Sequence, residues 1–100
     1  MLVNAKIEKA GLYYNGHYNR CEVGVVLKTR GGGATIHFPV EKVEEFMDMF
    51  DEELDLENGV FINDLEGVPV VLKLDGDTEF QSKIVAIGSI LASEGEMMPV

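Results

Sequence analysis

This chain of 100 residues has one cysteine, no tryptophan and no long apolar run. The one cysteine, Cys21, cannot form an intramolecular disulfide, which excludes a disulfide-stapled scaffold and a zinc site built on several thiolates. No apolar run approaches the roughly 18 residues that span a bilayer, and the amino terminus has no basic segment followed by a long apolar one. We therefore expect one soluble, cytoplasmic domain stabilised by packing, with no membrane partner.

Groups that carry catalysis or bind metals are equally few. The chain has two histidines, no GxSxG elbow, and neither of the common glycine-rich nucleotide motifs. His17 and Cys21 straddle a predicted turn, so a zinc site is not expected, and residues 55–66 lack the glycine position of a calcium loop. Cys21 shares a predicted strand face with Val23 and Val25, so we expect a buried thiol. The sequence predicts a non-enzyme without metal or cofactor.

Acidic residues outnumber basic residues, and the excess is concentrated in one segment of the chain. The chain holds 18 acidic and 8 basic residues, for a net charge of −10, and residues 41–66 hold eleven of the acids and one lysine. We call residues 41–66 the acidic segment. It should repel nucleic acid, because phosphate neutralisation by Lys and Arg dominates that affinity, and it suits a cationic partner. The simpler interpretation is a solvated helix that keeps a small protein soluble.

Hydrophobic periodicity predicts the fold class. Alternating apolar residues predict strands over 2–14, 20–29, 34–40, 68–74 and 80–91, with a bulge at Gly11 and a hairpin turn at Asn15-Gly16. Between the third and fourth strands, Val43, Phe46, Met47 and Phe50 form one stripe of an amphipathic helix over 41–53. The expected fold is α+β: an antiparallel sheet of about five to six strands (β-β-β-α-β-β) with the helix packed on one face. The expected core comprises Ile7, Val23, Val25, Ile36, Phe38, Val43, Phe46, Phe50, Leu72 and Ile87.

The carboxyl-terminal part suggests self-association. The strands expected over 68–74 and 80–91 are apolar on both faces, and one helix cannot cover both. We therefore expect a single domain over 1–92, a short tail over 93–100, and a homo-oligomer that buries the second face.

Two turns offer an alternative ligand site. Residues 31–33 are three glycines between two strands, which favours a hairpin turn; a phosphate loop would be followed by a helix. The basic residues beside them, and the aromatic turn YYNGHYNR at 13–20, could instead hold an anionic nucleotide. The candidate ligand residues are Tyr14, His17, Tyr18, Arg20, Lys28 and Arg30.

The glycine-bearing hairpin, the acidic helix, the turn INDLEG and the closing strand KIVAIGSIL together resemble small acidic accessory proteins of bacteriophages and prophages. The resemblance covers most of the chain and implies a protein that acts inside a bacterial host cell, often by binding and blocking a defence system. We therefore expect an inhibitor that docks its acidic surface onto the basic surface of a host defence protein. The alternatives are an oligomer that sequesters an anionic nucleotide signal, and a phage structural or interaction module. The candidate protein-binding residues are Glu44, Glu45, Asp48, Asp51, Glu52 and Glu53.

Overall fold

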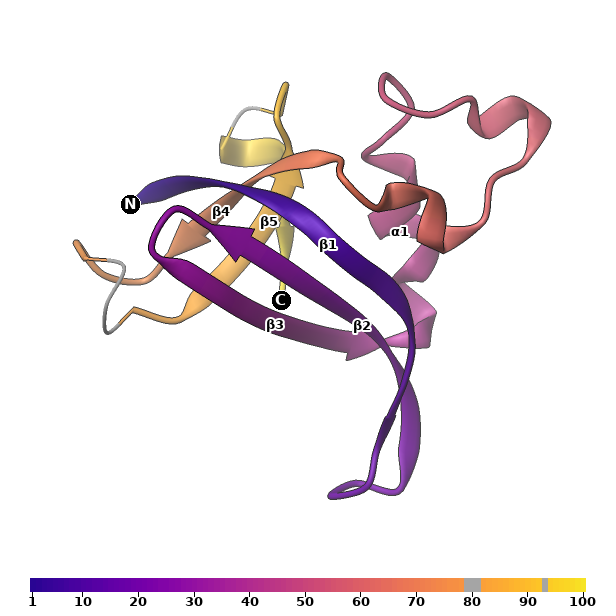
Figure 1. Cartoon of the computed structure of the whole chain (residues 1–100), viewed down its shortest axis with the longest axis horizontal. Coiled ribbons are helices and arrows are strands. Elements are labelled where there is room, and N and C mark those ends of the chain that lie inside the picture. Colours follow the sequence, from indigo (N-terminus) through magenta and orange to yellow (C-terminus); the bar gives the residue numbers. More distant parts are fainter. Residues whose placement is uncertain (79–81, 93) are drawn as a thin grey trace.

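A six-stranded antiparallel sheet, in the order β3-β2-β1-β4-β5-β6, forms the body of the part of the chain described by the computed structural model, residues 1–78, 82–92 and 94–100. The strands are β1 (Leu2–Asn15), β2 (Arg20–Thr29), β3 (Gly32–Pro39), β4 (Pro69–Leu74), β5 (Ile84–Ser89) and β6 (Met98–Pro99). Helix α1 (Val43–Asp48) follows β3 through a 3-10 turn, η1 (Val40–Lys42). Further 3-10 turns are η2 (Leu56–Asn58), η3 (Ile62–Leu65) and η4 (Glu94–Glu96). The predicted α+β class is confirmed, and Figure 1 shows α1 near the end of the sheet where β3 finishes.

The first three strands pair in order as an antiparallel meander, and the bulge in β1 lies at a different residue from the one predicted. Ile7 lies opposite Leu27 whereas Lys9 lies opposite Val26, so the extra residue is Glu8. The prediction of a bulge at Gly11 is wrong. Ile7 bonds through its backbone to Gly67 and Val68 ahead of β4, and β1 leaves β4 directly afterwards. A bulge at this point bends the strand away from its neighbour.

Each of the two hairpin turns contains one residue with positive φ, and only one of these two residues is a glycine. In the β1–β2 turn Asn19 has φ of 52°, and Gly16 is not among the residues with positive φ. In the β2–β3 turn Thr29 pairs with Gly32, whose φ is 143°. The glycine triplet thus belongs to a hairpin, as the alternation on either side of it predicts.

The core lies between the inner face of the sheet and the α1 region. Phe46 and Phe50 are fully buried, and the Phe46 ring lies 5.1 Å from the ring of Phe38 on β3. The predicted core residues are all buried except Val43, which is partly buried against the same cluster. The helical stripe therefore faces the sheet as predicted.

Helix α1 is shorter than the predicted helix over 41–53. It ends at Asp48, and residues 49–54 continue as turns in which Glu53 and Leu54 donate to the Phe50 carbonyl. The last turn contains no basic residue. Carboxylates there are repelled by the partial negative charge of the helix carboxyl end and by the acids four residues earlier. The acids that favour the start of the helix therefore oppose its extension.

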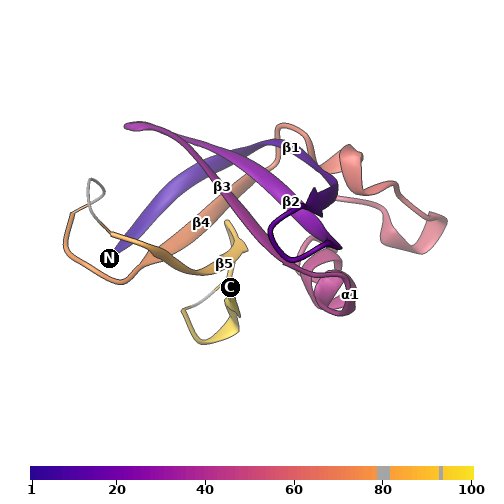
Figure 2. The ribbon, with the colours of Figure 1, turned by 90° about the horizontal axis from the view of Figure 1, so that it is seen from below.

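The last residues are part of the sheet instead of a free tail. Met98 on β6 pairs with Ile87 and is buried in the core, and Met97 packs over Gly88 of β5. Figure 2 shows this segment folded back beside β5. It covers part of the face that we expected a second copy to bury. The strand predicted over 80–91 is confirmed only for Ile84–Ser89, and residues 80 and 81 lie outside the described residues.

Among the described residues, no helix has both the length and the apolar character needed to cross a membrane.

Candidate functional site

The acidic segment is open to solvent along most of its length. Its side chains come from η1, α1 and the long connection to β4, which loops out beyond α1 in Figure 1. Of the six predicted protein-binding residues, five are exposed: Glu44, Glu45, Asp48, Asp51 and Glu52. The buried phenylalanines of the same stretch fix the α1 region against the sheet, so these carboxylates stand on a held backbone.

No ion pair neutralises these five carboxylates within the part of the chain that the structure describes. Among the described residues the ion pairs are Arg20 with Glu22 and His37 with Glu22, neither of which involves the acidic segment. Lys42, the segment's one lysine, instead donates to the Pro99 carbonyl at 3.4 Å. The segment therefore presents concentrated negative charge that a basic partner could neutralise.

Glu53 differs from the other five. It is only partly exposed, and both carboxylate oxygens are buried without a hydrogen-bond partner among the described residues. Its orientation follows from the turn at Phe50, to whose carbonyl the Glu53 N–H donates. Glu53 therefore does not share the open surface of its neighbours.

Phe61 is the functional candidate that the sequence reasoning missed. It lies inside the acidic segment and is 79% exposed. The Asp64 carboxylate accepts a 2.9 Å hydrogen bond from the Phe61 N–H and so fixes the start of η3, while Leu65 of the same turn is fully buried. An exposed aromatic ring on a held backbone is a typical anchor of a protein interface. The only hint in the sequence was a lone aromatic residue between acidic turns.

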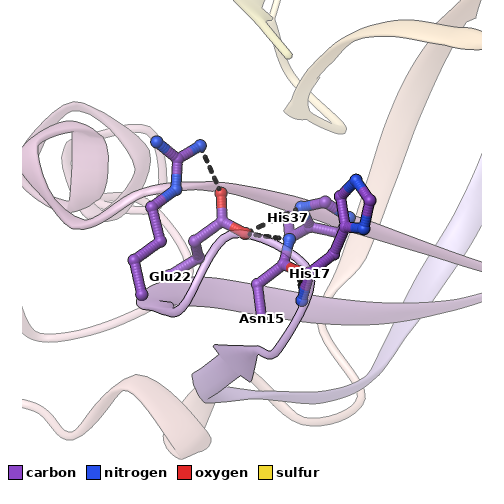
Figure 3. Close-up of polar contacts among 5 residues, drawn as sticks. Asn15, His17, Glu22 and His37 are labelled. Atoms are coloured by element: carbon purple, nitrogen blue, oxygen red, sulfur yellow. Dashed lines mark hydrogen bonds and ion pairs between the residues drawn. The ribbon is translucent and has the colours of Figure 1, made fainter.

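The aromatic turn at 13–20 is organised around a buried carboxylate (Figure 3). The Glu22 side chain is 3% exposed, and its Oε1 accepts a 2.8 Å hydrogen bond from Asn15 Nδ2. His37 Nδ1 lies 3.3 Å from the same oxygen, and Arg20 donates to Oε2 at 3.2 Å. Asn15 Oδ1 also accepts from the backbone of His17. The cluster joins β1, β2, β3 and their turn.

These contacts hold Glu22 in its charged form. The hydrogen bond from Asn15 is the main cause of a lowered Glu22 pKa, burial opposes it, and Arg20 and His37 contribute further to the lowering. The alternation of apolar residues along β2 puts Glu22 on the solvent-facing side of the strand, where polar neighbours bury it instead of the apolar core.

Cys21 is exposed, so its predicted burial is wrong: β3 ends at Pro39, opposite Glu22, and Cys21 lies beyond it.

The six candidate ligand residues are not brought together in one chain. Arg20 is already engaged by Glu22 and lies 5.2 Å from the Tyr18 ring centroid, and His17 meets the same ring edge-on. Tyr14 donates to the Asn19 side chain at 3.4 Å. Lys28 and Arg30 lie at the opposite end of β2, about 30 Å away for a strand of this length.

A groove of about 580 Å³ lies beside the glycine hairpin, between β3 and the start of β5. Its floor is apolar, with Val3, Leu72 and Ile84, and its rim includes Gly31–Gly33 and Lys83. Lys28 and Arg30 are not among its lining residues. The groove therefore lacks the paired cations that the nucleotide hypothesis requires.

No cluster of three or more His, Cys, Asp or Glu suited to a metal ion occurs in the part of the chain that the structure describes. Comparisons with models of known protein families, with curated proteins and with solved structures found no match. The features that bear on function are therefore the exposed carboxylates of the acidic segment and the exposed ring of Phe61.

Proposed function

We propose that this chain is a non-enzymatic binding protein that docks its acidic segment onto a basic, nucleic-acid-binding surface of a bacterial defence protein and blocks that surface. The observations that carry the proposal are the five exposed carboxylates of the acidic segment, which have no ion pair among the described residues, and the exposed ring of Phe61 in the same segment. Carboxylates on a held backbone can occupy sites that otherwise bind phosphates, and the exposed Phe61 ring can add apolar burial to the interface. The likeness to phage accessory proteins supports the host cytoplasm as the place of action.

The proposal is tested by capture from a bacterial lysate. Immobilised protein should retain a partner with a nucleic-acid-binding surface, the partner should elute as salt rises, and added double-stranded DNA should displace it. Glu44→Lys with Glu45→Lys should lose the partner. Glu8→Lys with Asp77→Lys changes the net charge equally at exposed positions outside the acidic segment and should retain it. Equal loss in both pairs would assign the binding to net charge alone and overturn the proposal.

The alternatives predict different results. A nucleotide sponge should bind cyclic nucleotides or ADP-ribose derivatives in calorimetry and should lose them on Arg30→Ala or Tyr18→Ala. A structural or interaction module should capture a partner that lacks a basic surface and that DNA does not displace.

A further inference from the structure

Strand β3 ends the sheet on one side and leaves its outer edge open. It pairs with β2 along its whole length, and no strand lies on its other side among the described residues. Figure 1 shows it as the outer strand of the meander. The usual blocks to strand pairing are missing, because the pairing with β2 has no bulge and residues 31–38 contain no proline, lysine, arginine, aspartate or glutamate. This open side of residues 32–38, which we call the β3 edge, is able to accept a further strand.

The pairing of the inner strands fixes which backbone groups face outward along the β3 edge. The N–H and C=O of Ile7 on β1 bond to the chain just before β4, so those of its partner Leu27 on β2 point towards β3. Leu27 lies opposite Ala34, which makes these two a hydrogen-bonded pair. Backbone groups alternate sides along an antiparallel strand. The N–H and C=O groups of Gly33 and Thr35 therefore point out of the sheet.

An apolar groove of about 580 Å³ lies directly beside the β3 edge. It is lined on one side by Gly33 and Thr35, and elsewhere by Leu72, Leu74 and Ile84 on the face of the sheet that carries the core, the inner face. Successive side chains of a strand point to opposite faces of a sheet. A strand added to β3 would therefore direct every second side chain into the groove, where apolar side chains would gain from burial.

The outer face of the sheet carries two lysines near the same edge. Lys6 and Lys28 lie directly opposite each other and are exposed, an unfavourable placement for like charges. The ion pairs among the described residues are those of Glu22, and neither lysine takes part in them. On its other side Lys28 lies opposite Gly33, which has no side chain to separate Lys28 from the β3 edge. An acidic residue opposite Gly33 on an added strand would lie about 10 Å from the Lys28 backbone, two strand spacings away, a distance that the two side chains can span.

The opposite wall of the groove favours neither sign of charge. Lys83 lines the groove there, and Asp75 Oδ1 accepts a 2.8 Å hydrogen bond from the Lys83 N–H, so a cation and an anion lie side by side. The charge preference at the β3 edge is therefore set by Lys28 and Lys6, and it is for an acidic side chain on the outer face.

We propose that the β3 edge binds an extended segment of a partner protein as an added antiparallel strand, with an acidic residue opposite Gly33 and apolar residues on both sides of it. Every strand pair of the described sheet is antiparallel, and the added strand continues that arrangement. The outward groups of Gly33 and Thr35 bond to the backbone of the segment, its apolar side chains enter the groove, and its carboxylate meets Lys28. Figure 1 shows the start of β3 at the end of the sheet away from α1, so this surface is separate from the acidic segment. The proposal does not depend on the function proposed for that segment.

Fluorescence anisotropy with a labelled short peptide of alternating valine and glutamate tests the charge preference. The wild type should bind this peptide at least about tenfold more tightly than the same peptide with glutamine for glutamate. A chain of net charge −10 repels the glutamate peptide as a whole, so a preference for it requires a local cation. Lys28→Gln should remove the preference, whereas Lys42→Gln, beyond the other end of β3, changes the net charge equally and should retain it. Equal binding of the two peptides by the wild type, or equal loss in the two variants, would overturn the proposal.

Methylated peptides test the backbone pairing without changing the protein. In the proposed register the glutamate amides face β3 and the valine amides face away, so N-methylation of the glutamates should abolish binding and N-methylation of the valines should not. In the protein, Thr35→Pro removes only an outward N–H and should weaken binding at least about tenfold, while Thr35→Val keeps that donor and should bind as the wild type does. Circular dichroism of both variants should match the wild type. Binding that survives methylation of the glutamates, or no binding of the glutamate peptide at millimolar concentration, would refute strand addition at this edge.

Discussion

Asn15 Nδ2 donates a 2.8 Å hydrogen bond to Glu22 Oε1, joining the end of β1 to β2 across the base of the hairpin. Glu22 is buried, and its pKa is lowered, first by this bond and then by Arg20 and His37, against the opposing effect of burial. The Glu22 carboxylate therefore links the two strands of the hairpin, and the stabilisation that it contributes depends on its negative charge.

The interactions of the Glu22 carboxylate make one contribution to stability pH-dependent. A carboxyl whose folded pKa lies below its unfolded value stabilises the fold fully above the unfolded value, and the contribution is lost as pH falls through the folded pKa. Glu22→Gln keeps the shape and removes the charge. The difference in free energy of unfolding between wild type and variant should be constant near neutral pH and should narrow below the ordinary carboxyl pKa of 4.5. Denaturant titrations at a series of pH values measure it; a difference that never narrows would contradict the assignment.

Phe46 should dominate the packing of α1 on the sheet. Its ring is fully buried between Phe38 and Phe50, with centroid distances of 5.1 and 5.2 Å. Phe46→Ala should lower the free energy of unfolding by about 3–5 kcal/mol, because it leaves a cavity under the helix. Phe61→Ala removes the same ring from an exposed position and should change it by less than about 0.5 kcal/mol. A loss below about 1 kcal/mol at Phe46 would mean that the helix does not face the sheet in this way.

The sequence was sufficient for those parts of the fold that depend on local periodicity. Alternation along residues 20–29 predicts β2, and the spacing of Phe46 and Phe50 predicts the buried face of α1. The bulge at Glu8 was not predictable, because it depends on backbone bonds to Gly67 and Val68, far away in sequence. The end of α1 was missed because hydrophobic spacing alone does not include the repulsion among its acids.

The candidate site divides in the same way. The acidic segment is visible in the sequence because charge is carried by residue type. The exposure of Phe61 and the burial of Glu22 are not, since both depend on which neighbours the fold provides. The candidate ligand residues are separated within one chain for a related reason: the turn beside Arg20 and the turn with Arg30 are close in sequence but lie at opposite ends of one extended strand.

The carboxyl-terminal segment should be able to fold back over β5 only because Gly88 has no side chain. A Cβ at this position would lie 2.9 Å from Met97 Cγ and 3.2 Å from Ala92 Cβ. Gly88→Ala should therefore displace the segment that carries β6 and lower the free energy of unfolding by about 1–3 kcal/mol. Hydrogen exchange should show faster exchange at Val100, whose N–H donates to the Val85 carbonyl. Gly95→Ala, where a Cβ would meet nothing within 4 Å, is the matched control and should leave that amide protected.

Phe61 should contribute more to partner binding than any single carboxylate of the acidic segment. An exposed carboxylate gains little from one ion pair in high dielectric, whereas a ring that enters a pocket on a partner loses contact with water over its whole surface. With a partner captured from lysate, Phe61→Ala should weaken binding by about 2 kcal/mol, or roughly thirtyfold, at unchanged salt dependence. Glu45→Gln should weaken it less and reduce its salt dependence. Titration calorimetry at two salt concentrations separates the two effects, and undiminished binding by Phe61→Ala would leave the acidic charges alone as the contact.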